Sequence, residues 1–258
     1  MKWRSLEESA PQSAKRSLRE VCSERKALIA QYVPAEVQAI HGQVIQELEA
    51  SGIRDRSLQA GRQAPAFELP DPSGKIVSSA ELLELGPLVV CFFRGRWCPF
   101  CVAQLEAMNV RLERLQELRA SLVGISPQTP EQSFFMADQH HLRFPLLSDG
   151  GNEVARRFGL VYGVPDYQQE IYRRVFVNLP FVNGSSDWEL PIPATYVLAC
   201  RREERSRASS IILFAASDPD YTKRPEPDEI VDVVADFSQA ANDVGPGRLH
   251  LSRPNGES

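Results

Sequence analysis

Long apolar runs are missing from this sequence of 258 residues. Its longest apolar stretches, Leu88–Phe93 and Ile211–Ala216, are far shorter than the roughly 20 residues that cross a bilayer. The first ten residues, MKWRSLEESA, carry charges and hydroxyl groups where a signal peptide carries a continuous apolar segment. We therefore expect a soluble protein that stays in the cytoplasm and has no membrane partner.

An excess of positive charge is missing as well. Lys and Arg number 29 against 34 Asp and Glu, which gives a formal net charge of −5. Because binding to phosphates needs a basic surface, we expect no nucleic-acid partner. The 43% of hydrophobic and 24% of charged residues exclude a disordered chain. At roughly 150 residues per domain, the length allows one domain with an extension or two small domains.

Cysteine is scarce, and its five occurrences are too few for a protein built on a disulfide framework. Cys22, Cys91 and Cys200 stand alone, and we interpret them as small hydrophobic residues. Cys98 and Cys101 form a close pair. This pattern is typical of a protein from a reducing compartment that carries one special dithiol.

Residues 1–60 are predicted to form a helical extension. Apolar positions recur at helical spacing on both sides of Pro34, so we expect two helices, the second beginning at Pro34 and ending at Gly52. The apolar stripe of such a pair packs either on its own domain or on a second copy of the chain. A homodimer formed through these helices is therefore an expected interaction.

Residues 61–241 alternate short apolar runs with helical stretches, which predicts an α/β domain with a mixed central sheet flanked by helices. Strands are expected near Ala66–Leu69, Leu88–Phe93, Ser121–Ile125, Phe144–Leu147, Ala194–Ala199 and Ser210–Ala216. Helices are expected near Cys98–Leu118, Pro130–His140, Asn152–Phe158 and Pro227–Ala241. Residues 163–190 break the alternation and are interpreted as an insertion, and residues 242–258 as a flexible tail.

The cysteine pair lies where a predicted buried strand meets a predicted helix. A thiol at a helix N-terminus faces unpaired backbone N–H groups and the positive end of the helix dipole, so its pKa falls. Arg94 and Arg96, just upstream, are expected to help hold the thiolate. Cys98 is therefore the predicted nucleophile. Cys101, one helical turn later on the same face, is predicted to resolve the oxidised form of Cys98.

Two other interpretations of the pair are weaker. A Cys-x-x-Cys segment also serves as half of a zinc site, but four ligands are needed and the sequence has no second pair. The adjacent His140 and His141 seldom face one metal together. Two inert core cysteines do not fit the strand, turn and helix around the pair. We expect neither a metal nor an organic cofactor.

Pro193 comes directly before the strand that is expected near Ala194–Ala199. In a thioredoxin-type fold the loop before that strand carries a cis-proline that faces the nucleophilic sulfur. An X-Pro bond adopts the cis form at a cost of only about 0.5–1 kcal/mol. We expect Pro193 to be cis and to shape the face where substrate or reductant docks. An ordinary edge-strand proline is the alternative.

Six segments, taken in order, resemble the AhpC/TSA redoxin group, whose members are peroxiredoxin-like proteins of the thioredoxin superfamily. They are Ala64–Asp71, Phe92–Cys101, Leu122–Ser126, Phe144–Asp149, Pro193–Val197 and Asp218–Thr222. The resemblance implies a thioredoxin-like fold, thiol-dependent reduction of hydrogen peroxide or organic hydroperoxides, and a thioredoxin-like dithiol donor. It also implies that Cys98 is the peroxidatic cysteine and Cys101 the resolving one.

The resemblance is incomplete at the site. The family places a proline seven residues, and a threonine or serine three residues, before the nucleophile, where this chain has Cys91 and Gly95. The family's arginine falls at or next to Pro193. Arg94, Arg96 or backbone N–H groups are the substitutes that this sequence offers for binding the peroxide oxygens.

Three functions stay open on this evidence. A thiol peroxidase is favoured because several segments, among them Leu122–Ser126 and Phe144–Asp149, are redoxin features. A thioredoxin-like thiol-disulfide oxidoreductase acting on protein disulfides is the first alternative. The second is a non-catalytic redox sensor or scaffold whose helical extension binds a partner.

Substrate contacts are expected from Trp97, Pro99 and Phe100, which flank the dithiol, and from Trp188 in the insertion. The insertion is rich in aromatic residues near Pro193. These either wall the site and select bulky hydroperoxides or, more often for large rings, simply pack the insertion against the sheet.

Overall fold

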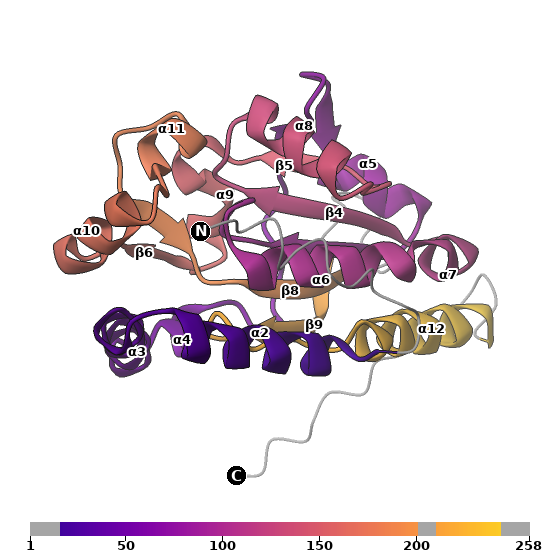
Figure 1. Ribbon diagram of the computed structural model, residues 1–258. Helices are drawn as coiled ribbons and strands as arrows, with labels where there is room; N and C mark the ends of the chain where they lie inside the picture. The colour runs from indigo at the N-terminus through magenta and orange to yellow at the C-terminus, as the bar shows by residue number, and fades with distance from the viewer. Residues whose placement is uncertain (1–15, 201–209, 244–258) are drawn as a thin grey trace, which may run out of the picture.

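A computed structural model describes residues 16–200 and 210–243. Its centre is a five-stranded sheet in the order β5-β4-β3-β8-β9 (Figure 1). The strands are β3 (Leu88–Phe92), β4 (Ser121–Ser126), β5 (Leu146–Ser148), β8 (Ala194–Cys200) and β9 (Ser210–Ser217). β3, β4 and β5 run parallel, β8 is antiparallel to β3, and β9 is antiparallel to β8. This mixed sheet confirms the predicted α/β class.

Helices cover both faces of the sheet. On one face lie α2 (Leu18–Tyr32), α6 (Pro99–Val110), α7 (Leu112–Glu117), α8 (Pro130–Gln139) and α12 (Pro227–Asp243). On the other lie α4 (Ile53–Arg56), α5 (Ser79–Leu85) and α9 (Glu153–Arg157), the last preceded by a 3-10 turn at Gly150–Asn152. All five residues of β3 are buried, as expected of a strand covered on both faces.

The side chains of β3 alternate between the two apolar layers. Val89 and Cys91 belong to the layer that contains α6, whereas Leu88, Val90 and Phe92 belong to the opposite layer. The strand therefore leads directly from the middle of the core to the start of α6. This connection determines where the two site cysteines lie.

The N-terminal helices α2 and α3 (Ala35–Ala50) are joined at Pro34. Gly52, with a φ of 68°, lies between α3 and α4 in the left-handed region that favours glycine. These helix limits agree with the sequence expectation. Residues 1–15 of the predicted extension lie outside the described residues.

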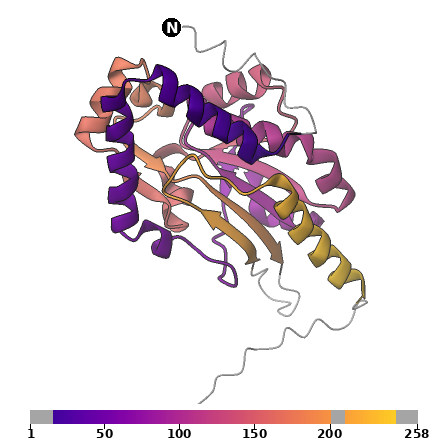
Figure 2. The same cartoon turned by 60° about the horizontal axis from the view of Figure 1, so that its bottom comes forward.

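Helix α2 packs on the sheet domain of its own chain. Its buried residues Leu18, Val21 and Cys22 lie in the same apolar cluster as the residues of α6. Figure 2 shows α2 beginning near the start of α12 and running across the molecule away from it. Because the apolar stripe of α2 is used within the chain, the predicted homodimer needs another surface of the extension and stays a prediction.

Residues 163–190 form a small helical lobe above one end of the sheet (Figure 1). Its base is the antiparallel pair β6 (Val161–Gly163) and β7 (Glu189–Pro191), and it contains α10 (Asp166–Arg174) and α11 (Leu179–Asn183). Sequence reasoning missed the strand pair because strands of three residues are too short to show a periodic pattern.

Two other elements differ from expectation. The helix expected over Cys98–Leu118 is divided into α6 and α7, because Arg111 between them has non-helical backbone angles. The strand expected near Ala66–Leu69 is β1 (Glu68–Pro70), which pairs with β2 (Ile76–Ser78) outside the central sheet. Residues 244–258 of the predicted tail lie outside the described residues.

Candidate active site

The dithiol lies at the first turn of α6. Cys98 is the N-cap residue, Pro99 occupies the first helical position, and Cys101 follows within the first turn. The two Sγ atoms are 3.0 Å apart and not bonded to each other. Both side chains are buried, with 1% and 0% of their surface exposed. A short movement of either sulfur therefore closes a disulfide, whose S–S bond is about 2.05 Å long.

Gly95 makes the turn between β3 and α6 possible. Its φ is 145°, and a Cβ atom at this position would lie 2.6 Å from the indole nitrogen of Trp97. The carbonyl oxygen of Gly95 accepts a hydrogen bond of 3.1 Å from the backbone N–H of Cys98. A side chain at residue 95 would therefore displace Trp97 or the start of the helix.

The environment of Cys98 favours its thiolate. Burial alone raises the pKa of this thiol, but the hydrogen bond from the Cys101 thiol, the charges of Arg94 and Arg224 and the backbone N–H of Cys101 outweigh burial and lower the pKa to about 5. For Cys101, burial, the hydrogen bond that it donates to Cys98 and the charge of Cys98 raise the pKa well above its ordinary value. This contrast favours Cys98 as the nucleophile of the reduced pair, which stays a prediction.

Arg94 supplies the buried positive charge. Only 2% of Arg94 is exposed. Its guanidinium donates to the hydroxyl of Tyr172, and its central carbon lies 4.8 Å from the ring centre of Trp97 and 4.3 Å from that of Tyr221. In the described part of the chain no carboxylate pairs with it. Since a buried cation needs a counter-charge, we expect the Cys98 thiolate, whose pKa the charge of Arg94 lowers, to fill that role.

Arg224 is a site residue that sequence reasoning missed. Its Nη2 atom lies 3.4 Å from the Sγ atom of Cys101. The residue follows the Asp218–Thr222 segment, which the family resemblance had singled out, but spacing along the chain gave no reason to place it beside the dithiol. The same loop brings Tyr221 against Arg94, so one loop supplies two residues near the dithiol.

The side chain of Arg96 is hydrogen-bonded to α8, and its expected role in holding the thiolate stays a prediction. Its Nε atom donates a hydrogen bond of 2.6 Å to Gln132 on α8, and its backbone N–H donates one of 3.0 Å to Gln128. In a regular extended chain Arg94 and Arg96 would point to the same side. The positive φ of Gly95 between them breaks that alternation and separates the two guanidinium groups.

Pro193 is trans, and the expectation of a cis-proline was wrong: the described residues contain no cis peptide bond. The physical reason is the path of the chain. Ile192 donates a hydrogen bond of 2.9 Å to Leu160 beside β6, and Ala194 already pairs with Phe92 in β3. The chain therefore continues directly from β7 of the small sheet into β8 of the central sheet, and a trans peptide bond at Pro193 permits this path. Pro193 is buried one residue before β8.

The residues expected to contact substrate lie in different surroundings. Trp97 is half-buried beside Arg94, and its ring lies 5.2 Å from that of Tyr172. Phe100 is a core residue, 1% exposed and packed against Tyr221. The carbonyl oxygen of Pro99 accepts a hydrogen bond from Arg25 of α2. A substrate contact by the half-buried Trp97 stays a prediction, whereas Phe100 is covered.

Trp188 lines a surface pocket of about 490 Å³ in the insertion, together with residues such as Phe176 and Arg173. The guanidinium of Arg173 lies 4.7 Å from the Trp188 ring centre. Trp188 and Trp97 pack against the same small apolar cluster. No hydrogen bond or ring contact joins Trp188 to the dithiol among the described residues, so a direct role in substrate binding stays a prediction.

The N-terminal helices contribute to the site, which sequence reasoning also missed. His41 of α3 lies 6.0 Å from the ring of Tyr172 and 6.1 Å from that of Tyr221. Burial and the charge of Arg94 lower the pKa of His41 to about 4, so it is neutral at pH 7. On α2, Cys22 shares the apolar cluster of Cys98. The extension therefore forms part of the wall around the dithiol.

Comparison with known proteins decides the family. Residues 60–201 match the model of the AhpC/TSA family, which is more than half of the chain. The chain belongs to the AhpC/TSA family. A putative peroxiredoxin of Mycobacterium tuberculosis is 31% identical over 120 residues, covering 46% of this chain and 78% of the relative. Peroxiredoxin Bcp of Escherichia coli is 30% identical over 115 residues, covering 45% and 72%.

Solved structures agree on the fold of this AhpC/TSA protein. The crystal structure of peroxidoxin BcpB from Mycobacterium tuberculosis superposes with a TM-score of 0.53 and 22% identity, covering 70% of this chain and 98% of that one. A peroxiredoxin Q structure from Xanthomonas campestris gives a TM-score of 0.52 and 15% identity, covering 70% and 99%. The thioredoxin-like fold is confirmed, and the protein is a peroxiredoxin-like, thiol-dependent peroxidase.

Within this family the chain has its own arrangement of the site. Cys91, where the family has a proline, lies in the middle of β3 and pairs across the sheet with Thr195. Gly95 replaces the hydroxyl residue that precedes the family's nucleophile, and its positive φ explains the glycine. Among the described residues, no helix is long and apolar enough to cross a membrane, and no group of three His, Cys, Asp or Glu is placed to hold a metal.

Proposed function

We propose that this protein reduces hydrogen peroxide or a small organic hydroperoxide through Cys98 and Cys101. The Cys98 thiolate attacks one peroxide oxygen, the O–O bond breaks, and the leaving oxygen departs as water or an alcohol. Cys98 is left as a sulfenic acid. Cys101 then displaces its hydroxyl group as water and forms a disulfide, and a thioredoxin-like dithiol donor reduces that disulfide.

The observation that carries this proposal is the 3.0 Å separation of the two sulfurs beside the buried Arg94, which pairs with no carboxylate of the described residues. A thiol with a pKa of about 5 is almost fully ionised at pH 7, so Cys98 is ready to attack. Cys101 stays protonated until Cys98 has reacted, because its pKa lies far above that of Cys98. The two thiols therefore act in a defined order.

Two buried donors are available for the peroxide oxygens. The Nε atom of Arg94 and the indole nitrogen of Trp97 are both buried without a hydrogen-bond partner. Both residues belong to the turn that ends at Cys98. We infer that these N–H groups bind the peroxide and stabilise the negative charge on the leaving oxygen. They replace the hydroxyl and arginine groups that the family pattern places elsewhere.

Burial of the site bears on the choice of substrate. Cys98 is 1% exposed and Cys101 is not exposed, and α2 packs against the start of α6. A peroxide of a few atoms reaches such a sulfur with little displacement of its surroundings, whereas a folded protein, whether it brings a disulfide or is the dithiol donor, reaches it only after α2 or the start of α6 moves. This supports a small hydroperoxide as oxidant over a protein disulfide.

The test follows the sulfur oxidation state. Reduced protein is mixed with one equivalent of hydrogen peroxide and analysed by mass spectrometry, together with the Cys98→Ser and Cys101→Ser variants. We expect a Cys98–Cys101 disulfide in the wild type, a sulfenic or over-oxidised Cys98 in the Cys101 variant, and no oxidation in the Cys98 variant. Consumption of hydrogen peroxide is then measured over many equivalents with thioredoxin and its reductase.

Two outcomes would favour the other functions. Reduction of insulin disulfides, with peroxide consumed no faster than by free thiol, would identify a thiol-disulfide oxidoreductase. Oxidation by a single equivalent without turnover, although the donor is present, would identify a redox sensor. Comparison of cumene hydroperoxide with hydrogen peroxide, before and after Trp188→Ala, tests the insertion, and an unchanged preference would exclude it from substrate selection.

A further inference from the structure

Arg224 contacts the resolving sulfur directly. Besides Cys98, the Sγ atom of Cys101 is approached by the backbone N–H of Arg94 at 3.5 Å and by Nη2 of Arg224 at 3.4 Å. The other terminal nitrogen of Arg224 donates hydrogen bonds of 2.6 Å to the carbonyl oxygens of Tyr221 and Lys223. The guanidinium is thus held by its own loop and presented to Cys101.

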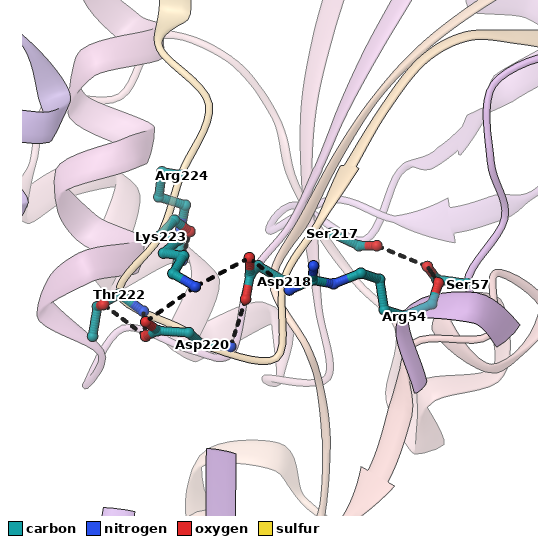
Figure 3. Close-up of polar contacts among 8 residues, drawn as sticks. All are labelled: Arg54, Ser57, Ser217, Asp218, Asp220, Thr222, Lys223 and Arg224. Atoms are coloured by element: carbon teal, nitrogen blue, oxygen red, sulfur yellow. Dashed lines mark hydrogen bonds and ion pairs between the residues drawn. The ribbon is translucent and has the colours of Figure 1, made fainter. Parts of the chain in front are cut away.

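The loop before Arg224 is well anchored (Figure 3). Asp218, after the end of β9, pairs with Arg54 of α4 at 3.0 Å and accepts a 2.8 Å hydrogen bond from the backbone of Asp220. Asp220 in turn accepts hydrogen bonds from the backbone and hydroxyl of Thr222, at 3.1 and 2.6 Å. These short-range turns determine the direction in which the chain reaches Arg224. The hydrogen bonds of this loop and those of the guanidinium itself therefore hold Arg224 in place beside Cys101.

The charge of Arg224 is not neutralised by a carboxylate. In the described part of the chain no Asp or Glu forms an ion pair with it. Glu226, two residues later, instead accepts hydrogen bonds from the backbone N–H groups of Leu18 and Arg19, at 2.9 and 2.8 Å. Glu226 therefore caps the start of α2 instead of pairing with Arg224. The guanidinium of Arg224 contacts the Cys101 sulfur.

The need of Cys101 for this cation depends on the state of Cys98. In the reduced enzyme the negative charge lies on Cys98, and Cys101 donates its proton toward it. Once Cys98 is a sulfenic acid, that charge and that hydrogen bond are gone. Burial still opposes ionisation of Cys101, and the groups that favour it are Arg224 and Arg94. Arg224 is the one whose side chain touches the sulfur.

We infer that Arg224 is a catalytic residue of the resolving step, where its guanidinium stabilises the Cys101 thiolate that attacks the Cys98 sulfenic acid. This inference rests on the proposed function. In that step the Cys101 thiol loses its proton, its sulfur forms the S–S bond, and the S–O bond of Cys98 breaks. The departing hydroxide takes up the proton and leaves as water. Arg94, by contrast, serves the earlier attack on the peroxide.

Rapid mixing separates the two steps. Reduced full-length protein is mixed with hydrogen peroxide, quenched at increasing times, and analysed for dimedone-trapped sulfenic acid and for the Cys98–Cys101 disulfide. In Arg224→Gln we expect disulfide formation to slow by about tenfold or more, as for loss of a charge-assisted hydrogen bond, while sulfenic acid formation slows by only a few-fold. Sulfenic acid therefore accumulates, and excess peroxide over-oxidises Cys98 more readily.

Two further variants distinguish catalysis from structure. Arg224→Lys keeps the charge, so it should recover most of the rate of disulfide formation. Lys223→Gln removes the neighbouring exposed cation, whose ion pairs with Asp218 and Asp220 are 3.8 Å long, and should leave both steps unchanged. The difference in the rate of disulfide formation between Arg224→Gln and the wild type should also shrink as the pH rises from 7 to 10, because hydroxide then removes the Cys101 proton without help from Arg224.

The outcomes separate this inference from the proposed function. If wild-type protein forms no sulfenic acid or disulfide with peroxide, the proposed function fails. If the wild type cycles but Arg224→Gln forms its disulfide at the wild-type rate, or loses both steps equally without rescue by lysine, only the role of Arg224 is overturned.

Discussion

The centre of β3 and the first turn of α6 each hold a buried thiol, and the two thiols differ in acidity. Cys91 and Cys98 are 0% and 1% exposed. Burial raises the pKa of Cys91 to about 12, even though Thr195 donates a hydrogen bond to it and Arg224 contributes a favourable charge. The pKa of Cys98 is lowered to about 5. Lack of solvent therefore does not decide whether a thiol is inert.

The difference arises from what the backbone and the charges offer at each place. Around Cys91 the peptide groups of β3 pair with β4 on one side and β8 on the other. At Cys98 the chain leaves the sheet and α6 begins. The first N–H groups of a helix have no carbonyl acceptor within the helix, so they can donate to a nearby thiolate. The buried Arg94, which no carboxylate of the described residues neutralises, adds a full charge at the same place. We therefore expect the thiol at the end of the sheet, Cys98, to be the reactive one.

The largest expected effect comes from replacing each of the two cysteines in turn. Cys98→Ser should reduce peroxide consumption on the order of a thousandfold or more, because serine is a far weaker nucleophile. Cys91→Ala should keep the peroxidase rate within about twofold and cost about 1 kcal/mol of stability from the small cavity. Peroxide loss and urea unfolding measure the two effects. A large loss of activity in the Cys91 variant would contradict the assignment.

Arg94→Gln should make Cys98 behave more like Cys91. Without the buried cation the pKa of Cys98 rises, and a thiol of ordinary pKa, about 8.5, is only about three per cent ionised at pH 7. We expect the rate of sulfenic acid formation at pH 7 to fall by up to about thirtyfold and to recover toward pH 9. Arg96→Gln is the matched control, since its guanidinium faces Gln132. An equal effect of both variants would refute the special role of Arg94.

The pH dependence of the wild type tests the same contrast without a mutation. Because the thiolate is the reactive form, the rate of the peroxide step should be nearly constant from pH 6 to 9 and fall by about tenfold by pH 4, as Cys98 with a pKa of about 5 takes up a proton. Single-turnover kinetics measure it, with circular dichroism as a check on folding. A rate that still climbs tenfold per unit between pH 7 and 9 would show an ordinary thiol.

The smallest effect concerns the cover over each thiol. Cys91 is shielded by the sheet, whereas α2 packs beside Cys98 and is capped by Glu226. Glu226→Gln weakens this cap and should raise the rate of Cys98 alkylation by iodoacetamide a few-fold, with no change at Cys91. Glu229→Gln, an exposed acid nearby on α12, is the control. Equal alkylation rates in both variants would show that α2 does not limit access.

The sequence by itself determined the local part of this protein. The apolar run of β3, the glycine turn and the cysteine that opens α6 lie within about fifteen consecutive residues. Strand and helix periodicity, helix-end chemistry and the spacing of the cysteines all act over such distances. The α/β class and the family resemblance could therefore be predicted from these residues, and the prediction that Cys98 is the nucleophile rests on them as well.

Only the tertiary structure decided what surrounds the dithiol. Arg224 is 123 residues from Cys101 along the chain, and His41 reaches the site from a helix that precedes the sheet. The order of strands and the packing of α2 and α3 bring these groups together, and no short pattern encodes such contacts. The bond from Arg96 to Gln132 was not predicted, and the form of Pro193 was predicted wrongly, because each depends on partners that are distant in sequence.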